Sequence, residues 1–175
     1  MAFLVCGGAL IGRLSVSGLD DFSRQLEALG AAADGIAKHA VYEGAAVGRA
    51  AIAAEIRALP EEHSRYIRPD SARKLNVVTP EEKADLLDHL GFSRIETANG
   101  KTTVSVSFDG YSARTATKKY PRGVPVVLVA RSIESGSSVR NKHPFVRNAI
   151  RKSSEKIQAA MKDAADEMIV KIAGG

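Results

Sequence analysis

The sequence is poor in the residues that build stacking surfaces, disulfide networks and membrane spans. Tryptophan is absent and aromatic residues make up 5% of the 175 residues, so no wall of stacked rings for ligands or bases is expected. A single cysteine excludes an internal disulfide and a zinc site built from several cysteines. No apolar run reaches the roughly 18 residues that cross a membrane. We therefore predict a soluble, intracellular protein without membrane contacts.

Sequence motifs for catalysis and cofactor binding are missing as well. The chain contains no G-x-x-x-x-G-K-[ST] phosphate loop, no G-x-G-x-x-G fingerprint, no H-x-x-x-H pair and no G-x-S-x-G elbow. His39, His63, His89 and His143 are spread along the chain, which gives no local support for a metal site or a catalytic base. We predict that the protein is not an enzyme and has no catalytic residue, metal ligand or cofactor.

Positive charge is concentrated in one third of the chain. The net charge is +5, and residues 101–156 contain 12 Lys and Arg against 3 Asp and Glu, whereas residues 1–100 contain 11 against 14. Such a segment is typical of a surface that meets nucleic acid, or of one that meets the acidic face of a neighbouring subunit. A solvated basic face without a partner has the same composition, so three alternatives remain open.

The N-terminal part is predicted to be mostly helical. Residues 1–13 form an apolar extension, and a short strand is expected over residues 13–17. The acidic residues that follow favour a helix start, and helical periodicity continues to Pro60, with a break or kink expected at Gly30. The spacing Gly44-x-x-x-Gly48 would permit another backbone to approach closely.

The middle of the chain contains the clearest local signals. Residues 60–79 are polar and interrupted by prolines, which predicts an extended loop or arm. Thr79-Pro80-Glu81-Glu82 then predicts a helix start, with a capping box and a proline at the first helical position. This helix should reach about Leu90, with Gly91 just after its C-cap. Residues 92–97 and 101–108 should form a hairpin, because Asn99-Gly100 suits a type I′ turn.

The C-terminal part is predicted to contain two more helices. The valines of residues 125–134 favour a strand, but their apolar spacing favours a helix between Pro125 and Gly136, and we choose the helix. Pro144 opens a last helix that should run to about Ile172. Its expected buried stripe consists of Val146, Ile150, Ile157, Met161, Ala164, Met168 and Ile172.

Two sets of charged residues are candidates for an electrostatic interaction surface. The basic set lies in the turn-rich segment 109–123 and consists of Arg114, Lys118, Lys119 and Arg122. The acidic set lies on the helix after Thr79 and consists of Glu81, Glu82, Asp85 and Asp88. The first set could meet either DNA phosphates or the second set on a neighbouring subunit, and a solvated helix face is the plain alternative for the second.

Several short stretches occur together in an order that is typical of one protein family. They are VSGLDDF (residues 16–22), TPEEKADL (79–86), FDGY (108–111), TKKYPRG (117–123), VARSIESGS (129–137) and HPFVRNA (143–149). Over about residues 14–170 the chain resembles the tail-component family of long-tailed bacteriophages, also called head–tail joining, neck or tail-completion proteins, in the branch from phages of Gram-positive hosts. It departs from the family in its apolar first twelve residues and in Asn148, where the family commonly has proline.

The resemblance implies a fold and a set of structural residues. The expected fold is α+β, a small antiparallel sheet with a hairpin, packed by long N-terminal and C-terminal helices, in a single domain over residues 1–175. Glu134 and Gly136 would end one element, with Gly136 free to adopt a positive φ. Pro144 and Phe145 would begin the last helix and anchor it to the core, where ordinary core packing is the expected role of Phe145.

The resemblance also implies a function and partners. The chain would be a structural viral protein of the virion neck or tail, assembled in the cytoplasm of the host bacterium. Its partners would be copies of itself, in a ring that is sixfold in the particle and surrounds the DNA channel, and the neighbouring head-connector and tail-tube or terminator proteins. Non-specific contact with DNA in the channel is expected as well. A basic, non-catalytic nucleic-acid-binding protein outside the virion is the alternative.

Overall fold

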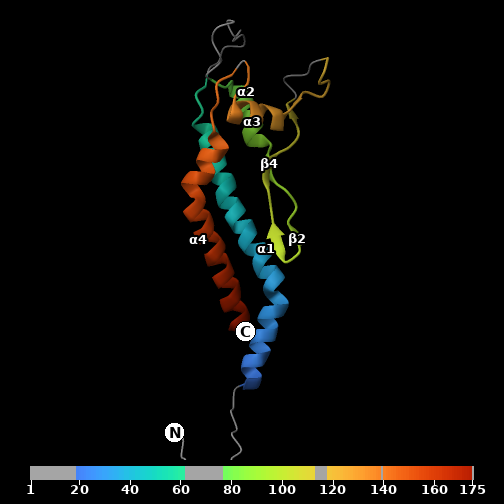
Figure 1. The fold of residues 1–175 in the computed structure, drawn as a ribbon, viewed down its shortest axis with the longest axis vertical. Coiled ribbons are helices and arrows are strands. Elements are labelled where there is room, and N and C mark those ends of the chain that lie inside the picture. Colours follow the sequence, from blue (N-terminus) through green and yellow to red (C-terminus); the bar gives the residue numbers. More distant parts are fainter. Residues whose placement is uncertain (1–18, 62–76, 113–117, 139, 175) are drawn as a thin grey trace, which may run out of the picture.

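Two long helices lie side by side in opposite directions and form a shaft that supports the rest of the chain (Figure 1). This computed structural model describes residues 19–61, 77–112, 118–138 and 140–174. The apolar extension 1–13, the strand expected over 13–17, most of the expected arm and Arg114 lie outside these residues. Long terminal helices and short antiparallel strands together confirm the predicted α+β fold class.

The first helix of the shaft is longer and more regular than predicted. Helix α1 (Leu19–Arg57) runs without interruption for 39 residues, so the break expected at Gly30 was wrong. A glycine inside a helix costs about 1 kcal/mol relative to alanine, and the alanines that follow Gly30 are the best helix formers and offset that cost. Helix α4 (Phe145–Ala173) begins directly after Pro144, as predicted, and returns along α1.

The two helices of the shaft approach each other closely at Gly44 and Gly48, which are both buried. A Cβ atom on Gly44 would meet Met161 of α4 and lie 2.9 Å from its Sδ atom, and one on Gly48 would lie 3.5 Å from Ile157. The missing side chains therefore let the side chains of α4 rest on the backbone of α1. The glycine spacing predicted the close approach of another backbone; the structure instead places side chains of α4 against these two glycines.

Two glycines of α1 should respond in opposite directions to substitution by alanine. Gly44→Ala should destabilise the protein by about 1–2 kcal/mol, because the added methyl group overpacks the contact with Met161. Gly30→Ala should stabilise it by roughly 0.5–1 kcal/mol, since nothing lies within 4 Å of the new Cβ and alanine is the better helix former. Urea denaturation of both variants measures the difference, and equal shifts of one sign would contradict the close packing.

The buried face of α4 differs from the predicted stripe near its start. Phe145, Ala149 and Ser153 are buried there, whereas Ile150 is 42% exposed, so its prediction as a buried residue was wrong. Ser153 can be buried because its hydroxyl donates a 2.7 Å hydrogen bond to the carbonyl of Ala149. Further along, Ala164 is buried as predicted. The other members of the stripe, Val146, Ile157, Met161, Met168 and Ile172, are half-buried.

Helices α2 (Pro80–Asp88) and α3 (Val126–Ser135) lie at one end of the shaft, which we call the head (Figure 1), and most of the large buried side chains belong to the core there. Both helices pack there on the end of α1 and the start of α4. The core of the head consists of Ile52, Ile56, Leu59, Val78, Leu86, Leu90, Val126, Ala130, Ile133, Phe145 and Ala149. The helix preferred over a strand for residues 125–134 is therefore confirmed, because α3 buries one apolar face in this core.

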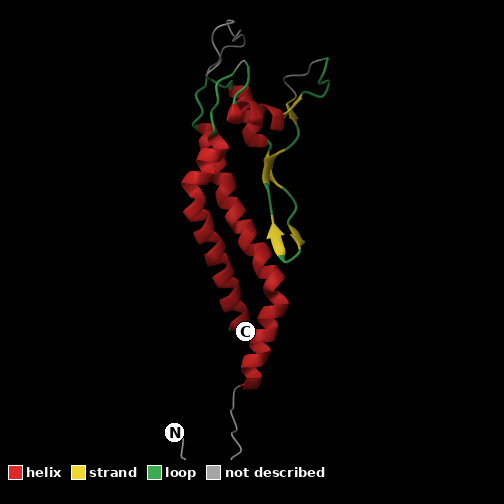
Figure 2. Cartoon of the chain, viewed as in Figure 1, coloured by secondary structure: helices red, strands yellow, loops and turns green. Residues whose placement is uncertain are grey.

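The predicted hairpin is present but interrupted (Figure 2). Strand β1 (Leu90–Phe92) pairs with β4 (Val106–Phe108), and further out β2 (Glu96–Ala98) pairs with β3 (Lys101–Thr103), both antiparallel. Asn99 and Gly100 at the tip have φ angles of 52° and 72°, as a type I′ turn requires. Because Leu90 and Gly91 belong to β1, α2 ends at Asp88, and the predicted extension of α2 to Leu90 with Gly91 after the C-cap was wrong.

A third ladder closes the base of the basic segment. Strand β5 (Tyr111–Ser112) pairs antiparallel with β6 (Val124–Pro125), so Ser112 and Val124, which flank residues 113–123, lie opposite each other. The described strands thus form three separate two-stranded ladders rather than the single small sheet that was expected.

The ends of the expected arm are joined in the head. The N–H of Val78, which is fully buried, donates a 2.9 Å hydrogen bond to the carbonyl of Pro60. The ammonium group of Lys83 donates to the carbonyls of Arg57 and Leu59 at 3.2 and 3.0 Å and lies 2.8 Å from the carboxylate of Glu61. A lysine of α2 therefore satisfies the C-terminal carbonyls of α1, which a helix end otherwise leaves without partners.

Candidate functional site

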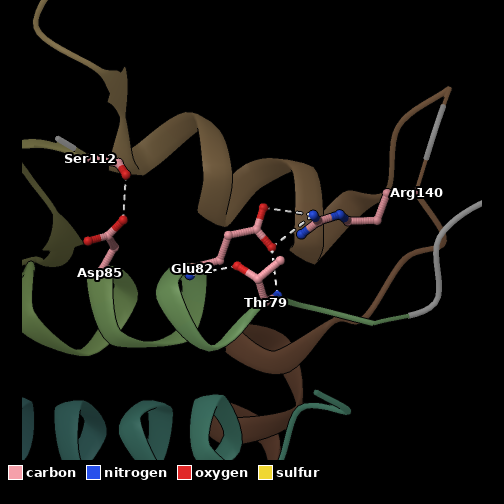
Figure 3. Close-up of polar contacts among 5 residues, drawn as sticks. All are labelled: Thr79, Glu82, Asp85, Ser112 and Arg140. Carbon is pink, nitrogen blue, oxygen red and sulfur yellow. Dashed lines mark hydrogen bonds and ion pairs between the residues drawn. The ribbon is translucent and has the colours of Figure 1, made fainter. Parts of the chain in front are cut away.

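The acidic set on α2 divides into two exposed and two half-buried residues. Glu81 and Asp88 are exposed, whereas Glu82 and Asp85 are half-buried and contact other elements (Figure 3). The N–H of Glu82 donates to the hydroxyl of Thr79, and the N–H of Thr79 donates to the carboxylate of Glu82, both at 3.1 Å. The predicted capping box is confirmed, and Glu82 is thereby fixed at the start of α2.

The carboxylate of Glu82 also holds the loop between α3 and α4. Arg140 reaches it with Nη2 at 2.8 and 2.9 Å from the two carboxylate oxygens, as Figure 3 shows. The Arg140 side chain is 10% exposed and that of Glu82 is 23% exposed, so water screens this ion pair little. The Nη1 atom of Arg140 is buried and has no hydrogen-bond partner in the described part of the chain.

Asp85 connects α2 to strand β5, which directly precedes the basic segment. Ser112 of β5 is 2% exposed, and its hydroxyl donates a short 2.5 Å hydrogen bond to the Asp85 carboxylate (Figure 3). The ring nitrogen Nδ1 of His89 lies 2.9 Å from the Asp85 carbonyl. Glu82 and Asp85 thus hold the head together, which leaves Glu81 and Asp88 as the members of the acidic set that face outward.

The described part of the basic set lies on the surface. Lys118, Lys119 and Arg122 are exposed, and Arg114 lies outside the described residues. The guanidinium of Arg122 sits 4.7 Å from the ring centre of Tyr111 and donates to its hydroxyl at 3.2 Å. A cation–π contact of this kind is worth about 0.5–1 kcal/mol at an exposed site, so Arg122 is positioned while it remains accessible.

The four residues singled out by the family resemblance form the turn from α3 into α4. Gly136 follows the last residue of α3 with a φ of 77°, and a Cβ there would lie 3.1 Å from the Lys142 backbone nitrogen. Phe145 is 2% exposed and packs edge-on against Phe108, as the core role predicted. Pro144 is the N-cap of α4 and has no side chain that caps the helix.

The carboxylate of Glu134, near the end of α3, caps the N-terminus of α4, where Pro144 makes no side-chain hydrogen bond. Its carboxylate accepts hydrogen bonds from the N–H groups of Val146 and Arg147, at 2.8 and 3.3 Å, and from the side chain of Arg147 at 3.0 Å. A carboxylate at a helix N-terminus satisfies free N–H groups and interacts favourably with the helix dipole. The motif therefore has a structural role that connects the end of α3 to the start of α4.

Sequence reasoning missed a basic concave surface beside this turn. One hollow of about 350 Å³ is lined by Ser135, Gly136, Ser137, Arg140, Asn141 and Lys142. A second hollow of about 310 Å³ is lined by Lys142, Pro144, Arg147, Asn148 and Arg151. The only sequence signal for this surface is the density of cations between residues 140 and 151, which does not show that they share one concave surface.

Within the described residues, no group of three or more His, Cys, Asp or Glu side chains lies close enough to hold a metal ion. At exposed Asp34 the hydrogen bond from Lys38 lowers the pKa of the carboxyl group. Of the helices described, none is long and apolar enough to cross a membrane.

Comparison with known proteins found no relatives. No protein-family model, no curated protein and no solved structure matches the chain.

Proposed function

We propose that the protein is a structural subunit of a bacteriophage neck or tail, and that its copies form a ring around the DNA channel at the head–tail connection. Its other partners are the neighbouring head-connector and tail-tube or terminator proteins. The proposal rests on the family resemblance of the motif residues and on one structural observation: the first turns of helix α1 extend beyond the rest of the described fold.

That observation concerns the first turns of α1. They project past the C-terminal end of α4, as Figure 1 shows, and most residues from Arg24 to Gly35 are exposed. Leu26 is 52% exposed although it belongs to an apolar helical repeat with Leu29 and Ile36. A helix normally buries such a stripe, because tertiary packing provides most of the stability of helices in proteins. A neighbouring copy that packs along this stretch would complete it.

The head carries a second surface suited to assembly. Val127 and Leu128 of α3 are 49% and 40% exposed and lie outside the face of the helix that is buried in the core. A ring requires a heterologous interface, in which one face of a subunit meets a different face of the next. The projecting part of α1 and the exposed face of α3 are two such different faces on one subunit, at opposite ends of the shaft.

A deletion experiment tests the proposed function directly. Removing the gene from its phage should leave DNA-filled heads and separate tails in electron micrographs of lysates, and the wild-type gene supplied in trans should restore joined particles. Normal particles without the gene product would reject the proposal. The alternative, a nucleic-acid-binding protein outside the virion, predicts normal particles and no labelling of the neck by antibodies against the protein.

Charge reversal of the basic set should block assembly without unfolding the subunit. The variant combines Arg114→Glu, Lys118→Glu, Lys119→Glu and Arg122→Glu. Single exposed ion pairs are worth about 0–1 kcal/mol, so one change should matter little and four together should prevent joining. The circular dichroism spectrum and melting temperature of the purified variant should stay close to wild type, since the described members of the set are exposed. If a phage that carries this variant has normal infectivity, neither DNA nor a neighbouring subunit is the partner, and the basic set is a solvated surface.

A rescue variant identifies the partner of the basic set. If the partner is the acidic face of a neighbour, adding Glu81→Lys and Asp88→Lys should restore assembly of the fourfold variant. If the partner is DNA, the added changes should restore nothing. Glu82 and Asp85 are left unchanged because their carboxylates hold Arg140 and Ser112 inside the head.

A further inference from the structure

The two hollows beside the α3–α4 turn form one basic surface, because they share Lys142. Together they are lined by four cationic residues, Arg140, Lys142, Arg147 and Arg151, and no acidic residue lines either one. Glu82 pairs with Arg140 and Glu134 pairs with Arg147, and neither glutamate is among the lining residues. We call this surface the basic hollow.

Two of the four cations have no counter-charge among the residues that the structure describes. Lys142 and Arg151 are exposed and make no ion pair with any residue that the structure describes. Arg140 lines the first hollow and is held there by its bonds to Glu82; because its Nη1 atom is buried, its contribution to the surface is positive charge. A concave surface with excess positive charge and available N–H donors favours an anion whose oxygens accept several hydrogen bonds.

The donors of this surface are side chains rather than the N-terminus of α4. The N–H groups of Val146 and Arg147, which point out of that helix end, already donate to the carboxylate of Glu134. The lining residues also include no aromatic ring on which a base would stack. Recognition here is therefore limited to charge and hydrogen bonds, which suits a phosphate group and gives no readout of base sequence.

We propose that the basic hollow binds the phosphodiester backbone of nucleic acid, with Lys142 and Arg151 as the main contacts and Arg140 and Arg147 in support. Two open, adjoining hollows suit successive phosphates of one strand better than a single enclosed anion. No member of the basic set at residues 114–122 is among the lining residues of this surface. The inference goes beyond the proposed function, since the affinity belongs to the free subunit and does not require a ring.

Duplex binding by purified full-length variants tests the inference. The test variant combines Lys142→Gln and Arg151→Gln. The matched control combines Arg94→Gln and Lys101→Gln, which also removes one arginine and one lysine, both exposed, from the hairpin side of the shaft. Fluorescence anisotropy of a labelled duplex of about 20 base pairs gives the affinity at salt concentrations from about 50 to 200 mM, the range over which phosphate contacts change most clearly.

The test variant should bind about tenfold more weakly at about 100 mM salt, and its slope of log affinity against log salt should be shallower by about 2. The control should bind within about twofold of wild type, and Lys142→Arg with Arg151→Lys should retain binding because the charges are kept. Equal losses in test and control, an unchanged test variant, or no duplex binding by wild type would each overturn the inference. Inorganic phosphate that displaces the duplex better than chloride at equal ionic strength would assign the hollow to the free anion instead.

Discussion

Replacing Phe145 with alanine is expected to lower the free energy of unfolding by about 4 kcal/mol. The side chain is 2% exposed and its ring lies edge-on to that of Phe108, with centroids 6.1 Å apart. It belongs to the same buried cluster as residues of α1, α2 and α3, so the deletion would leave a cavity where α4 joins the head. Urea denaturation followed by circular dichroism measures the loss.

Two further variants make this expectation specific. Ile150→Ala, on the same helix, should cost less than about 1 kcal/mol because Ile150 is already 42% exposed. Phe145→Leu fills most of the same space and should cost about 1.5 kcal/mol, which keeps the measurement possible if Phe145→Ala does not fold. A loss for Phe145→Ala no greater than that for Ile150→Ala would contradict the placement of Phe145 in the core.

The second large effect is expected from Glu82→Gln, which should cost about 3 kcal/mol. The amide oxygen still accepts the hydrogen bond from Thr79, so the capping box is kept while the negative charge beside Arg140 is lost. Removing one partner of a buried ion pair lowers the free energy of unfolding by about 3–5 kcal/mol, because the other charge stays buried without a counter-charge. The Glu82 side chain is 23% exposed, so water can partly solvate the site and we expect a loss at the lower end of this range.

Asp88→Asn is the matched control for this change. It removes one carboxylate from the same helix, but Asp88 is exposed and lies at the C-terminal end of α2, where a negative charge opposes the helix dipole. Its free energy of unfolding should stay within about 0.5 kcal/mol of wild type or rise slightly. If both variants lose the same free energy of unfolding, the effect of Glu82→Gln comes from the removal of one negative charge from α2 and not from the ion pair with Arg140.

Features that depend on a few neighbouring residues were predictable from the sequence. The capping box at Thr79 and the type I′ turn at Asn99-Gly100 follow from local chemistry, and both are confirmed; the positive φ of Gly136, which the family resemblance implied, is observed as well. The long terminal helices followed from apolar periodicity. These signals are strong because the residues that determine the conformation lie within one or two turns of each other.

Features that depend on distant partners were not predictable. Glu82 appeared as one of four acids on a solvated helix face, but Arg140, 58 residues away, makes it an internal residue. Glu134 was expected only to end α3, whereas its carboxylate caps α4 across the turn. Ile150 fitted the helical stripe, yet the direction from which the head packs on α4 buries Ala149 instead. Periodicity gives the faces of a helix but not which partner approaches each face.

The hydrogen bond between Val78 and Pro60 has a consequence for how the chain can vary. It joins two anchors that flank residues 61–77, and Leu59 and Val78 beside it are both buried. With both anchors held by the head, the closure entropy of the chain between them depends only weakly on its length, because a doubling costs about 0.6 kcal/mol. We therefore expect an epitope tag or a protease cleavage sequence placed between the two anchors to leave the packing of the head intact.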